Sequence, residues 1–507
     1  MMMTATALTD LVVKYDLKTL VFFGVVLAYL AYQLSLLLYN AWFHPLRKIP
    51  GPFFARTTRL WATYWNRQGR RAEQIQAAHQ RYGPIVRVGP NQVSFADPDA
   101  IPEIYNNPSL IKDEKFYSAR RMFREDHTFA FRDPEAHRQR RKLLSRGFSQ
   151  ASMFDFEPVL TTKIETLLRQ WSTRTKDGSP IDVYPWCHWL GFDAVYHLMF
   201  DRDAGSLKAG EPSPVMAWLR AWRPMFIYKE IVPQLEQWGV YVPGPIGDNF
   251  RRVRDWKNYS VELIRNVRKT KVETPFLRGA LAEKDGRLGR PLNDSELAEE
   301  CMGGMFGGSG TTANTFLFLI YAVCRDPRVY TKLKQELAEA IPDPKTIPSY
   351  TMASKLPYLS AVINEALRRH PTIVATLPRE AKETVVVQGM VFPKGTILGT
   401  QNYTVHRDSK AFPDPELYLP ERWLDEDKEQ QKLMKAAFNA FGNGSRKCIG
   451  INLAQFELWK VVAAFFRRFE CTIDSSMMDE DMRPYDNFSA GPAGLRLLIH
   501  LKDTAAS

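Results

Sequence analysis

Cysteine is scarce in this chain, which has five cysteines among 507 residues: Cys187, Cys301, Cys324, Cys448 and Cys471. Because their number is odd and they are widely spaced, the sequence argues against a disulfide framework and for a reducing compartment. No second cysteine or histidine stands beside Cys448 at the spacing of a zinc ligand pair. A structural zinc or iron–sulfur site is therefore poorly supported.

Linkers and repeats are also missing. Length alone would allow three domains of about 150 residues each, but no Gly/Ser-rich linker, internal repeat or low-complexity tract divides the chain. We therefore expect one large domain. A dinucleotide-binding fingerprint and a fused flavin domain are absent as well, so the chain does not carry its own nucleotide-binding module.

Acidic residues are outnumbered, since 56 Asp and Glu stand against 68 Lys and Arg, a formal charge of +12. Such an excess is compatible with a nucleic-acid binder. However, much of it lies near the N-terminal segment and in a short stretch that contains Arg138, Arg140, Arg141, Lys142 and Arg146. We expect a positive patch that faces an acidic protein or anionic lipid, and no nucleic-acid partner.

Charge is absent from Thr19 to Phe43, a run of 25 residues rich in Leu, Val, Phe and Tyr. About 20 apolar residues span a bilayer as a helix, whereas a cleaved signal peptide has a core of about 7–15 and a small-residue cleavage site. A buried core helix is the alternative, but the run is too long and is apolar on all sides. We predict a transmembrane signal anchor over 19–43, preceded by an N-terminal flank over 1–18.

The segment after this run is basic and rich in proline. Charges before the run cancel, whereas Arg47 and Lys48 follow it, and the positive-inside tendency then places the C-terminal bulk in the cytosol. Pro50-Gly51-Pro52 stops any helix and provides a stiff elbow. We expect a proline-rich hinge over 44–55.

Short strands and long helices are predicted in the remainder. Ile85–Val88 and Gln92–Phe95, joined by Gly89-Pro90-Asn91, indicate a β-hairpin. Further strands are expected at 384–388, 396–401 and 494–499, and helices at 72–81, 156–173, 250–269 and 330–340. The predicted fold class is mainly α with small antiparallel β-sheets (α+β).

Segment 441–450, Phe-Gly-Asn-Gly-Ser-Arg-Lys-Cys-Ile-Gly, encloses one cysteine in glycines. Glycines permit positive φ and a close approach to a flat ligand, and Arg446 favours an anionic sulfur at Cys448. A haem iron is the natural recipient of such a thiolate. For an isolated Cys-x-Gly, a buried free cysteine in a turn is the alternative.

This segment resembles the haem-binding signature of the cytochromes P450, the haem-thiolate monooxygenases, which reads Phe-Gly-x-Gly-x-Arg-x-Cys-x-Gly. All six fixed positions match. The resemblance implies the cytochrome P450 fold, haem b with Cys448 as the iron ligand, and a haem-thiolate catalytic domain over 56–507. The proline-rich hinge is similar to that of membrane-anchored microsomal members, and the layout to fungal ones. A single-pass protein of the endoplasmic reticulum with a cytosolic catalytic domain is then implied.

A long glycine-rich helix is expected to begin at Asn293, where Glu296 completes a capping pattern, and to end before Pro327. It would have about 30 residues and a length of roughly 45 Å. Glycine costs about 1 kcal/mol in a helix relative to alanine, so something flat or close must need this surface; a helix crossing is the alternative. The glycines are Gly303, Gly304, Gly307, Gly308 and Gly310.

Segment 307–312 of this helix resembles the family's distal motif Ala/Gly-Gly-x-Asp/Glu-Thr-Thr, where the backbone opens over the haem. The resemblance implies that Thr311 is catalytic and helps to deliver protons. Gly310 stands where the motif has an acid. Protons would then come through water, Ser309, a substrate hydroxyl or a distant acid.

Glu365 and Arg368 stand three residues apart on one face of an expected helix. Alone, they are typical of a solvated surface pair. Together with Pro420-Glu421-Arg422-Trp423 they resemble the family's Glu-x-x-Arg and Pro-Glu-Arg-Phe motifs. The resemblance implies a structural triad of Glu365, Arg368 and Arg422 that braces the cysteine loop and is costly unless fully paired.

Haem carries two propionates, which need cations. By the same resemblance, the candidates are Arg446, Arg379, and His137 with Arg141 one helical turn later. His137 stands where many members have tryptophan; it can still donate one hydrogen bond, but its protonation can vary. A solvated basic face is the alternative for His137 and Arg141.

These resemblances imply a monooxygenase that inserts one oxygen atom from O2 into a lipophilic secondary-metabolite scaffold, such as a terpenoid, polyketide or alkaloid. NADPH-cytochrome P450 reductase, with its flavins, would supply electrons, and cytochrome b5 is a second candidate partner. Docking is expected near Arg138, Arg140, Lys142 and Lys447. Pocket walls are expected from 116–131, 218–240, 302–311, 372–377 and 488–493. A reductase-independent haem-thiolate isomerase or dehydratase, and a haem sensor, are the alternatives.

Overall fold

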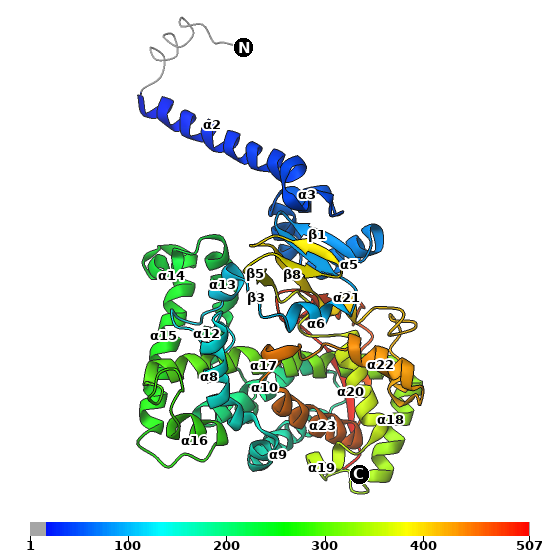
Figure 1. Cartoon of the computed structure of the whole chain (residues 1–507). Coiled ribbons are helices and arrows are strands. Elements are labelled where there is room, and N and C mark those ends of the chain that lie inside the picture. The colour runs from blue at the N-terminus through cyan, green and yellow to red at the C-terminus, as the bar shows by residue number, and fades with distance from the viewer. Residues whose placement is uncertain (1–16, 506–507) are drawn as a thin grey trace, which may run out of the picture.

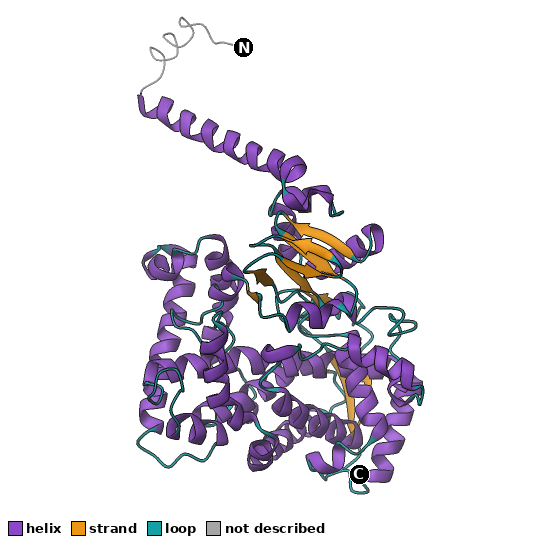
Figure 2. Cartoon of the chain, in the orientation of Figure 1, coloured by secondary structure: helices purple, strands orange, loops and turns teal. Residues whose placement is uncertain are grey.

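The computed structural model describes residues 17–505, and these are mainly helical with short strands grouped at a few places (Figure 2). The predicted fold class is therefore confirmed. The flank charges Asp10, Lys14 and Asp16, on which part of the orientation argument rests, lie outside the described residues.

An apolar helix projects from the rest of the molecule (Figure 1). It runs as α2 (Leu17–Leu38) and continues as a π-helical turn, η1 (Tyr39–Phe43). The stretch Val21–Phe43 is long and apolar enough to cross a membrane, and none of its most apolar window is buried. Its exposure distinguishes it from a core helix, as the sequence predicts.

The base of this helix is fixed to the first strand. Arg87 of β1 (Ile85–Gly89) is fully buried, and its guanidinium donates to the carbonyl oxygens of Asn40 at 3.0 Å and Pro90 at 2.6 Å. Its backbone N–H also donates to the Pro50 carbonyl at 2.8 Å. The Asn40 side chain donates to the Thr57 carbonyl at 3.1 Å. Segment 44–55 is therefore held against the sheet by these hydrogen bonds.

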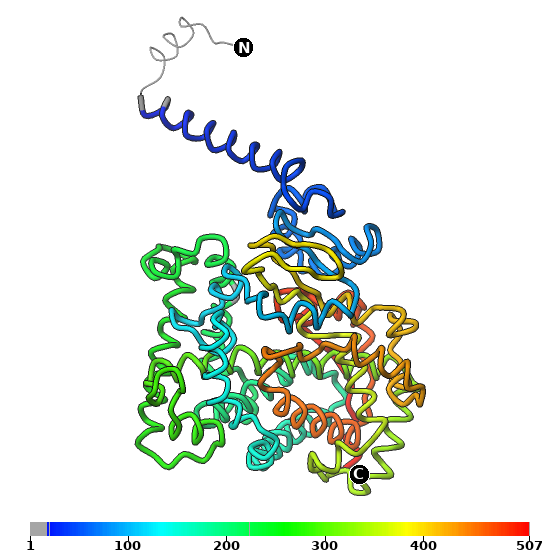
Figure 3. Tube along the Cα trace, viewed as in Figure 1, coloured from blue at the N-terminus to red at the C-terminus, as the bar shows by residue number. Residues whose placement is uncertain are grey.

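A five-stranded sheet of order β1-β2-β8-β5-β3 lies next to this base. The predicted hairpin of β1 and β2 (Gln92–Phe95) is present. β2 pairs with β8 (Ile397–Thr400) in parallel, which the sequence analysis did not anticipate, and β8 continues antiparallel to β5 (Arg379–Ala381) and β3 (Leu110–Lys112). In Figure 3 these blue and yellow segments, far apart in sequence, lie side by side.

The remaining strands form smaller antiparallel sheets. They are β4-β12-β9 (Ile181–Asp182, Leu498–Asp503, Phe469–Ile473), β6-β7 (Val385–Val387, Met390–Phe392) and β10-β11 (Pro484–Tyr485, Gly491–Pro492). The strand expected at 494–499 begins only at Leu498, because Leu495 adopts a positive φ of 51° and its N–H closes a turn onto the Pro492 carbonyl.

Helices cover the rest of the described chain, and the four predicted ones are present as α5, α9, α15 and α18 with shifted ends. Up to residue 282 the helices are α3 (Phe53–Thr57), α4 (Leu60–Arg67), α5 (Arg71–Tyr82), α6 (Ala100–Tyr105), α7 (Glu114–Ser118), α8 (Pro134–Ser145), α9 (Gln150–Arg174), α10 (Val183–Phe200), α11 (Ser206–Ala209), α12 (Pro214–Arg220), α13 (Trp222–Ile231), α14 (Leu235–Trp238), α15 (Gly244–Val267) and α16 (Pro275–Ala282). They are followed by α17 (Asp294–Arg325), α18 (Pro327–Ala340), α19 (Tyr350–Ala353), α20 (Pro357–Arg369), α21 (Asn402–Val405), α22 (Lys428–Ala437) and α23 (Ile451–Arg468).

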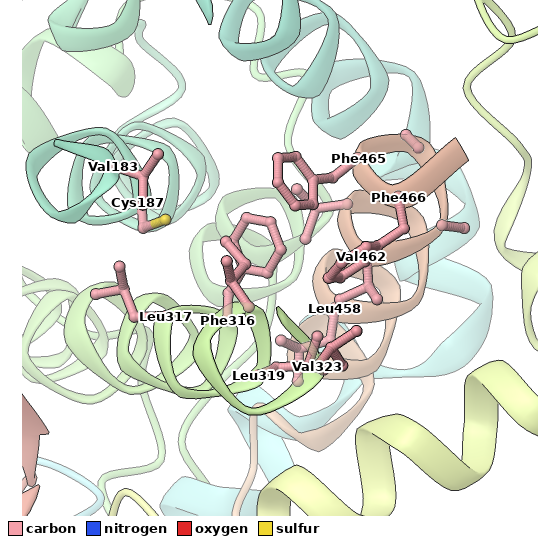
Figure 4. Close-up of a cluster of buried hydrophobic side chains, with 14 of the residues drawn as sticks. Val183, Cys187, Phe316, Leu317, Leu319, Val323, Leu458, Val462, Phe465 and Phe466 are labelled. Carbon is pink, nitrogen blue, oxygen red and sulfur yellow. The ribbon is translucent and has the colours of Figure 1, made fainter. Parts of the chain in front are cut away.

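The glycine-rich helix α17 lies at the centre of the core, between α10 and α23 (Figure 4). Asn293 and Glu296 form the predicted capping box at its start. Beyond the glycines, most of its apolar side chains are buried, and Phe316 and Val323 are almost fully so. Burying large side chains of this kind contributes about 1.5–3 kcal/mol each, so the core holds α17 firmly and thereby positions its glycine-rich half.

Candidate active site

A cavity extends from the glycine-rich half of α17 to the cysteine loop. It encloses about 1900 Å³ of space free of protein atoms, its mouth included. Thr311 and Cys448, which are far apart in sequence, both line it. The sequence-predicted catalytic pair therefore faces one common space.

The cysteine loop is a tight turn that presents the Cys448 side chain to this cavity. The backbone N–H of Cys448 donates to the Phe441 carbonyl at 2.8 Å. Gly442 and Gly444 have positive φ angles of 74° and 69°, a region that favours glycine. A Cβ at Gly444 would also lie 2.7 Å from the carbonyl oxygen of Tyr105. These glycines therefore serve the turn itself and its close packing.

The Cys448 side chain is accessible to solvent, and it faces the cavity. Desolvation of the sulfur by the cavity walls raises the pKa of its thiol, while a backbone hydrogen bond from Gly450 and the charges of Arg141 and Lys447 lower it. The loop thus contributes groups that favour the anionic sulfur, as a metal-binding thiolate requires.

Cations gather on one wall of the cavity. His137 and Arg141 project from α8, Arg446 comes from the cysteine loop, and Lys112 ends strand β3. The sequence analysis missed Lys112, since nothing in its neighbourhood distinguishes it from a surface lysine. Within the described residues, none of these four forms a salt bridge; Arg446 donates instead to the carbonyls of Phe131 and Arg132, at 3.0 and 3.3 Å.

Burial, and after it mutual repulsion, lowers the pKa values in this cluster. Burial, with Arg446 and Arg379, lowers the pKa of Lys112 well below its usual value. Burial, followed by Arg446, Lys112 and Arg141, lowers the pKa of His137 to about 2. His137 is therefore a neutral imidazole at physiological pH. A cluster of basic side chains that form no salt bridge with the other described residues is suited to an anionic ligand that compensates its charge.

Arg379 lies behind the wall rather than in it. It is buried, and its Nη1 donates to the Tyr117 hydroxyl at 2.8 Å. Because Arg379 nevertheless lowers the pKa of both Lys112 and His137, it belongs to the same electrostatic cluster. Of the predicted cofactor residues, His137, Arg141, Arg446 and Cys448 reach the cavity directly.

Thr311 lies on the cavity-facing side of α17, and its hydroxyl donates to the Gly307 carbonyl at 2.9 Å. The helix is continuous from Asp294 to Arg325. The expected opening of the backbone over the cavity is therefore absent from this described segment. The Thr311 hydroxyl bond lies within the helix, and the glycines adopt regular α-helical geometry.

The glycines of α17 serve two purposes. A Cβ at Gly304 or Gly308 would lie 2.6 Å from Met199 or 2.7 Å from Val195 of α10, so these two permit a close helix crossing. A Cβ at Gly307 would meet nothing within 4 Å, so that glycine keeps the cavity wide. The helix crossing and the need for an open surface, both considered from the sequence, therefore apply to different glycines.

A buried acid that the sequence analysis missed lies beneath the distal helix. Glu457 of α23 is 2 % exposed, and burial raises its pKa to about 8, a shift that the neighbouring Thr312 side chain partly offsets. Thr312 lines the cavity beside Thr311. Position 310 itself holds glycine with open space around it, so sterics do not explain the missing acid there.

The predicted triad is assembled and buried. Glu365 Oε1 lies 2.7 Å from Arg368 Nη2 and 3.2 Å from Arg422 Nε. Arg368 also donates to the carbonyls of His406, Pro415 and Leu417. Trp423 Nε1 donates to Glu365 Oε2 at 2.9 Å. The solvated-pair alternative is therefore wrong, and the pair holds the segment that leads to the cysteine loop.

Comparison with known proteins agrees with this geometry. The cytochrome P450 family model matches residues 50–498. The chain belongs to the cytochrome P450 family. It is 30 % identical to benzoate 4-monooxygenase bphA of Aspergillus niger, over 89 % of this chain and 92 % of the relative. It is also 30 % identical to the cytochrome P450 monooxygenases cypX of Dothistroma septosporum, over 94 % of each, and tazI of Aspergillus terreus, over 91 % and 95 %.

This cytochrome P450 is therefore an oxidoreductase that incorporates oxygen, and its family implies haem. The residues present fit that cofactor. Cys448 offers a sulfur to a metal, the cavity has room for a large flat molecule, and the cations of its wall lack carboxylate partners among the described residues. Lys112, His137, Arg141 and Arg446 would hold the propionates.

The prediction that Arg140 belongs to the docking surface of the P450 is wrong. Arg140 is 4 % exposed and forms buried ion pairs with Asp285 at 2.8 Å and Glu300 at 2.6 Å. It lies on the inner face of α8, so it cannot face a docking protein. Arg138, Lys142 and Lys447 are exposed.

One predicted wall of the P450 pocket also lies elsewhere. The cavity is lined from 116–131, 302–311, 372–377 and 488–493, but no residue of 218–240 reaches it. Trp222 and Phe226 of α13 instead pack edge-on against Phe306, at centroid distances of 5.9 and 5.2 Å. The Phe306 ring separates them from the cavity, so they support the wall from behind.

Proposed function

We propose that this cytochrome P450 inserts one oxygen atom from O2 into a lipophilic substrate, with electrons delivered from NADPH by a separate reductase. The single observation that carries the proposal is the placement of Cys448 and Thr311 on one cavity, with an unpaired cationic wall beside them. When bound there, haem supplies the activation of molecular oxygen.

The chain's own residues hold the cofactor and control protons. Cys448 is the proposed iron ligand. His137 would donate one hydrogen bond to a propionate, while Arg141 and Arg446 supply positive charge. Thr311 is the proposed catalytic hydroxyl, and it would exchange its present bond to the Gly307 carbonyl for one toward the reacting centre.

Substrate selection is assigned to an aromatic wall. Phe488 has a positive φ of 69° and stacks on Phe306 at 5.6 Å, with Phe129 edge-on at 5.7 Å. Next to it, the buried Ser489 hydroxyl lines the cavity and has no hydrogen-bond partner among residues 17–505. These groups favour an apolar or aromatic body with one hydrogen-bonding group, such as a terpenoid, polyketide or alkaloid scaffold.

We further propose that the chain is a single-pass protein of the endoplasmic reticulum, with the anchor over 19–43, the hinge over 44–55 and the catalytic domain over 56–507 in the cytosol. The exposed apolar stretch Val21–Phe43 and the basic residues after it support this arrangement. The exposed Arg138, Lys142 and Lys447 would face NADPH-cytochrome P450 reductase or cytochrome b5.

Reconstitution in vesicles tests the function. Candidate scaffolds are incubated with the full-length haem protein, NADPH, reductase and oxygen, and products are analysed by mass spectrometry with ¹⁸O2. One labelled oxygen in a product that requires all components is expected. Product formed equally well without reductase or oxygen would overturn the proposal in favour of an isomerase or dehydratase.

A further inference from the structure

Two cysteines that are 147 positions apart in sequence are in contact in the fold. Cys324 lies in the last turn of α17 and Cys471 lies in β9, and their sulfur atoms are 3.2 Å apart. A disulfide has an S–S distance of about 2.05 Å, so the two sulfurs need to approach by only about 1.1 Å. The wide spacing of cysteines in the sequence concealed this pair.

The surroundings of the pair distinguish its two members. The hydrogen bond with Cys471, together with burial, raises the pKa of the Cys324 thiol well above its usual value. In this contact either thiol can be the donor to the other sulfur. Cys471 has Tyr330 beside it, whose hydroxyl accepts from the Cys471 backbone N–H at 3.0 Å, and it interacts electrostatically with Lys334.

The other cysteines have no such partner among the described residues. Cys301 is buried and donates to the Met199 carbonyl at 3.3 Å, Cys187 is buried in the core, and Cys448 faces the cavity. Cys324, by contrast, is only partly buried, so a small oxidant can reach the pair from the surface.

We propose that Cys324 and Cys471 are a reversible dithiol–disulfide pair, oxidised by hydrogen peroxide and reduced again by cellular thiols. In a reducing compartment the resting form is the dithiol, and the disulfide forms only under oxidant. This inference does not depend on the proposed substrate or reductase.

The reaction balances with peroxide alone. One of the two sulfurs, as a thiolate, attacks one peroxide oxygen, the O–O bond breaks, and the leaving hydroxide takes a proton to give water and a cysteine sulfenic acid. The sulfur of the other cysteine then attacks the sulfenic sulfur, an S–S bond forms, and the S–OH group leaves with the thiol proton as a second water. Two thiols have lost two electrons and two protons, and one peroxide has become two waters.

The disulfide would join the C-terminal end of the distal helix to the β9–β12 pair, where Cys471 stands opposite Leu501. The disulfide would also protect the pair, because a sulfenic acid with an adjacent thiol is converted to a disulfide before it is oxidised further. The cavity-facing half of α17 lies at the other end of the helix and is not joined.

Peptide mapping of the full-length haem protein in detergent tests the pair. The folded protein is treated with hydrogen peroxide, denatured, alkylated with N-ethylmaleimide and digested without reductant. We expect a cross-linked peptide containing Cys324 and Cys471, about 2 Da lighter than the two thiol peptides together, which disappears after dithiothreitol.

Two variants sharpen the result. In Cys324→Ala no cross-link can form, and Cys471 is expected to gain about 32 Da as sulfinic acid. Cys301→Ala removes a buried cysteine outside the pair and should keep the cross-link. Full alkylation of both cysteines in the peroxide-treated wild type, with its circular dichroism unchanged, would overturn the proposal, as would separate oxidation of each cysteine without a cross-link.

Discussion

Glu365 and Arg368 form an ion pair of 2.7 Å in which both side chains are fully buried. The same spacing on another helix, Glu135 and Arg138, gives an equally short pair that is exposed. Only the buried pair has its remaining donors and acceptors engaged by the backbone and by Trp423. The two pairs have the same sequence spacing, but the buried pair should contribute far more to stability than the exposed pair.

Glu365→Gln is expected to lower the free energy of unfolding by about 3–5 kcal/mol, because it leaves two buried guanidinium groups without their counter-charge. Chemical denaturation of the detergent-solubilised protein, followed by circular dichroism, measures the change. Glu135→Gln is the matched control and should unfold like the wild type. Equal effects of the two substitutions would refute the structural role of the triad.

Cys448→Ser is expected to abolish the thiolate-type Soret band of the reduced carbon-monoxide complex, since an alcohol oxygen cannot replace the thiolate as a ligand. Absorption spectra of the purified variant measure this. Cys301→Ser, at a buried cysteine outside the cavity, should retain the band. Survival of the band in the Cys448 variant would show that another residue is the axial ligand.

Thr311→Ala is expected to lower product formation by on the order of 10²-fold while NADPH consumption continues, because a positioned proton donor is lost. The ratio of product to NADPH consumed is the measurement. On the exposed face of α18, the Thr331 hydroxyl donates in the same way to the carbonyl four residues earlier, at 2.8 Å. Thr331→Ala should therefore preserve the ratio, and an unchanged ratio in Thr311→Ala would exclude the proposed role.

Glu457 should make stability depend on pH. Burial raises its folded-state pKa from 4.5 to about 8, so the folded protein binds a proton that the unfolded chain releases between these values. The free energy of unfolding then falls as pH rises from about 4.5 to about 8. Glu457→Gln removes this pH-dependent loss of stability. Across that window, the free energy of unfolding of the variant should therefore rise relative to that of the wild type by up to about 5 kcal/mol.

Denaturation curves at pH 5 and pH 9 provide the measurement for Glu457. The exposed Glu262→Gln variant is the control and should follow the wild type at both values. A constant difference between wild type and Glu457→Gln at the two pH values would mean that Glu457 is ionised throughout.

Arg87→Met should loosen the base of the apolar helix, because the carbonyls of Asn40 and Pro90 lose their donor. Cleavage by trypsin at the exposed Arg47 and Lys48 should become severalfold faster, as local opening exposes the backbone there. Arg59→Met changes an exposed arginine of the same region and serves as the control. Identical cleavage rates in both variants and the wild type would show that Arg87 does not restrain this segment.

Much of the site was predictable from local sequence because its motifs are local. The cysteine loop needs glycines at Gly442 and Gly444 for its positive φ angles, and the capping box of α17 lies within four residues. In such patterns, the residues that cause the local structure are close together in the sequence, so the structure can be predicted from them.

The remainder depends on contacts between distant segments. Lys112 joins the cationic wall only because β3 pairs with β5, and the parallel pairing of β2 with β8 joins strands some 300 residues apart. Arg140 was misplaced because the acids that bury it, Asp285 and Glu300, stand far away in sequence. Glu457 has an unremarkable local context, and only the packing of α23 under α17 removes it from water.

The five-stranded sheet has a mechanical consequence. Its β1 edge carries Arg87, which holds the base of the proposed membrane anchor, and its opposite edge carries Lys112 beside the cofactor wall. Each strand between these edges is hydrogen-bonded to the next, so a displacement of the proposed anchor would pass through the sheet to the wall that contains Lys112. Bilayer thickness and curvature would thereby affect how tightly the residues of this wall hold the cofactor.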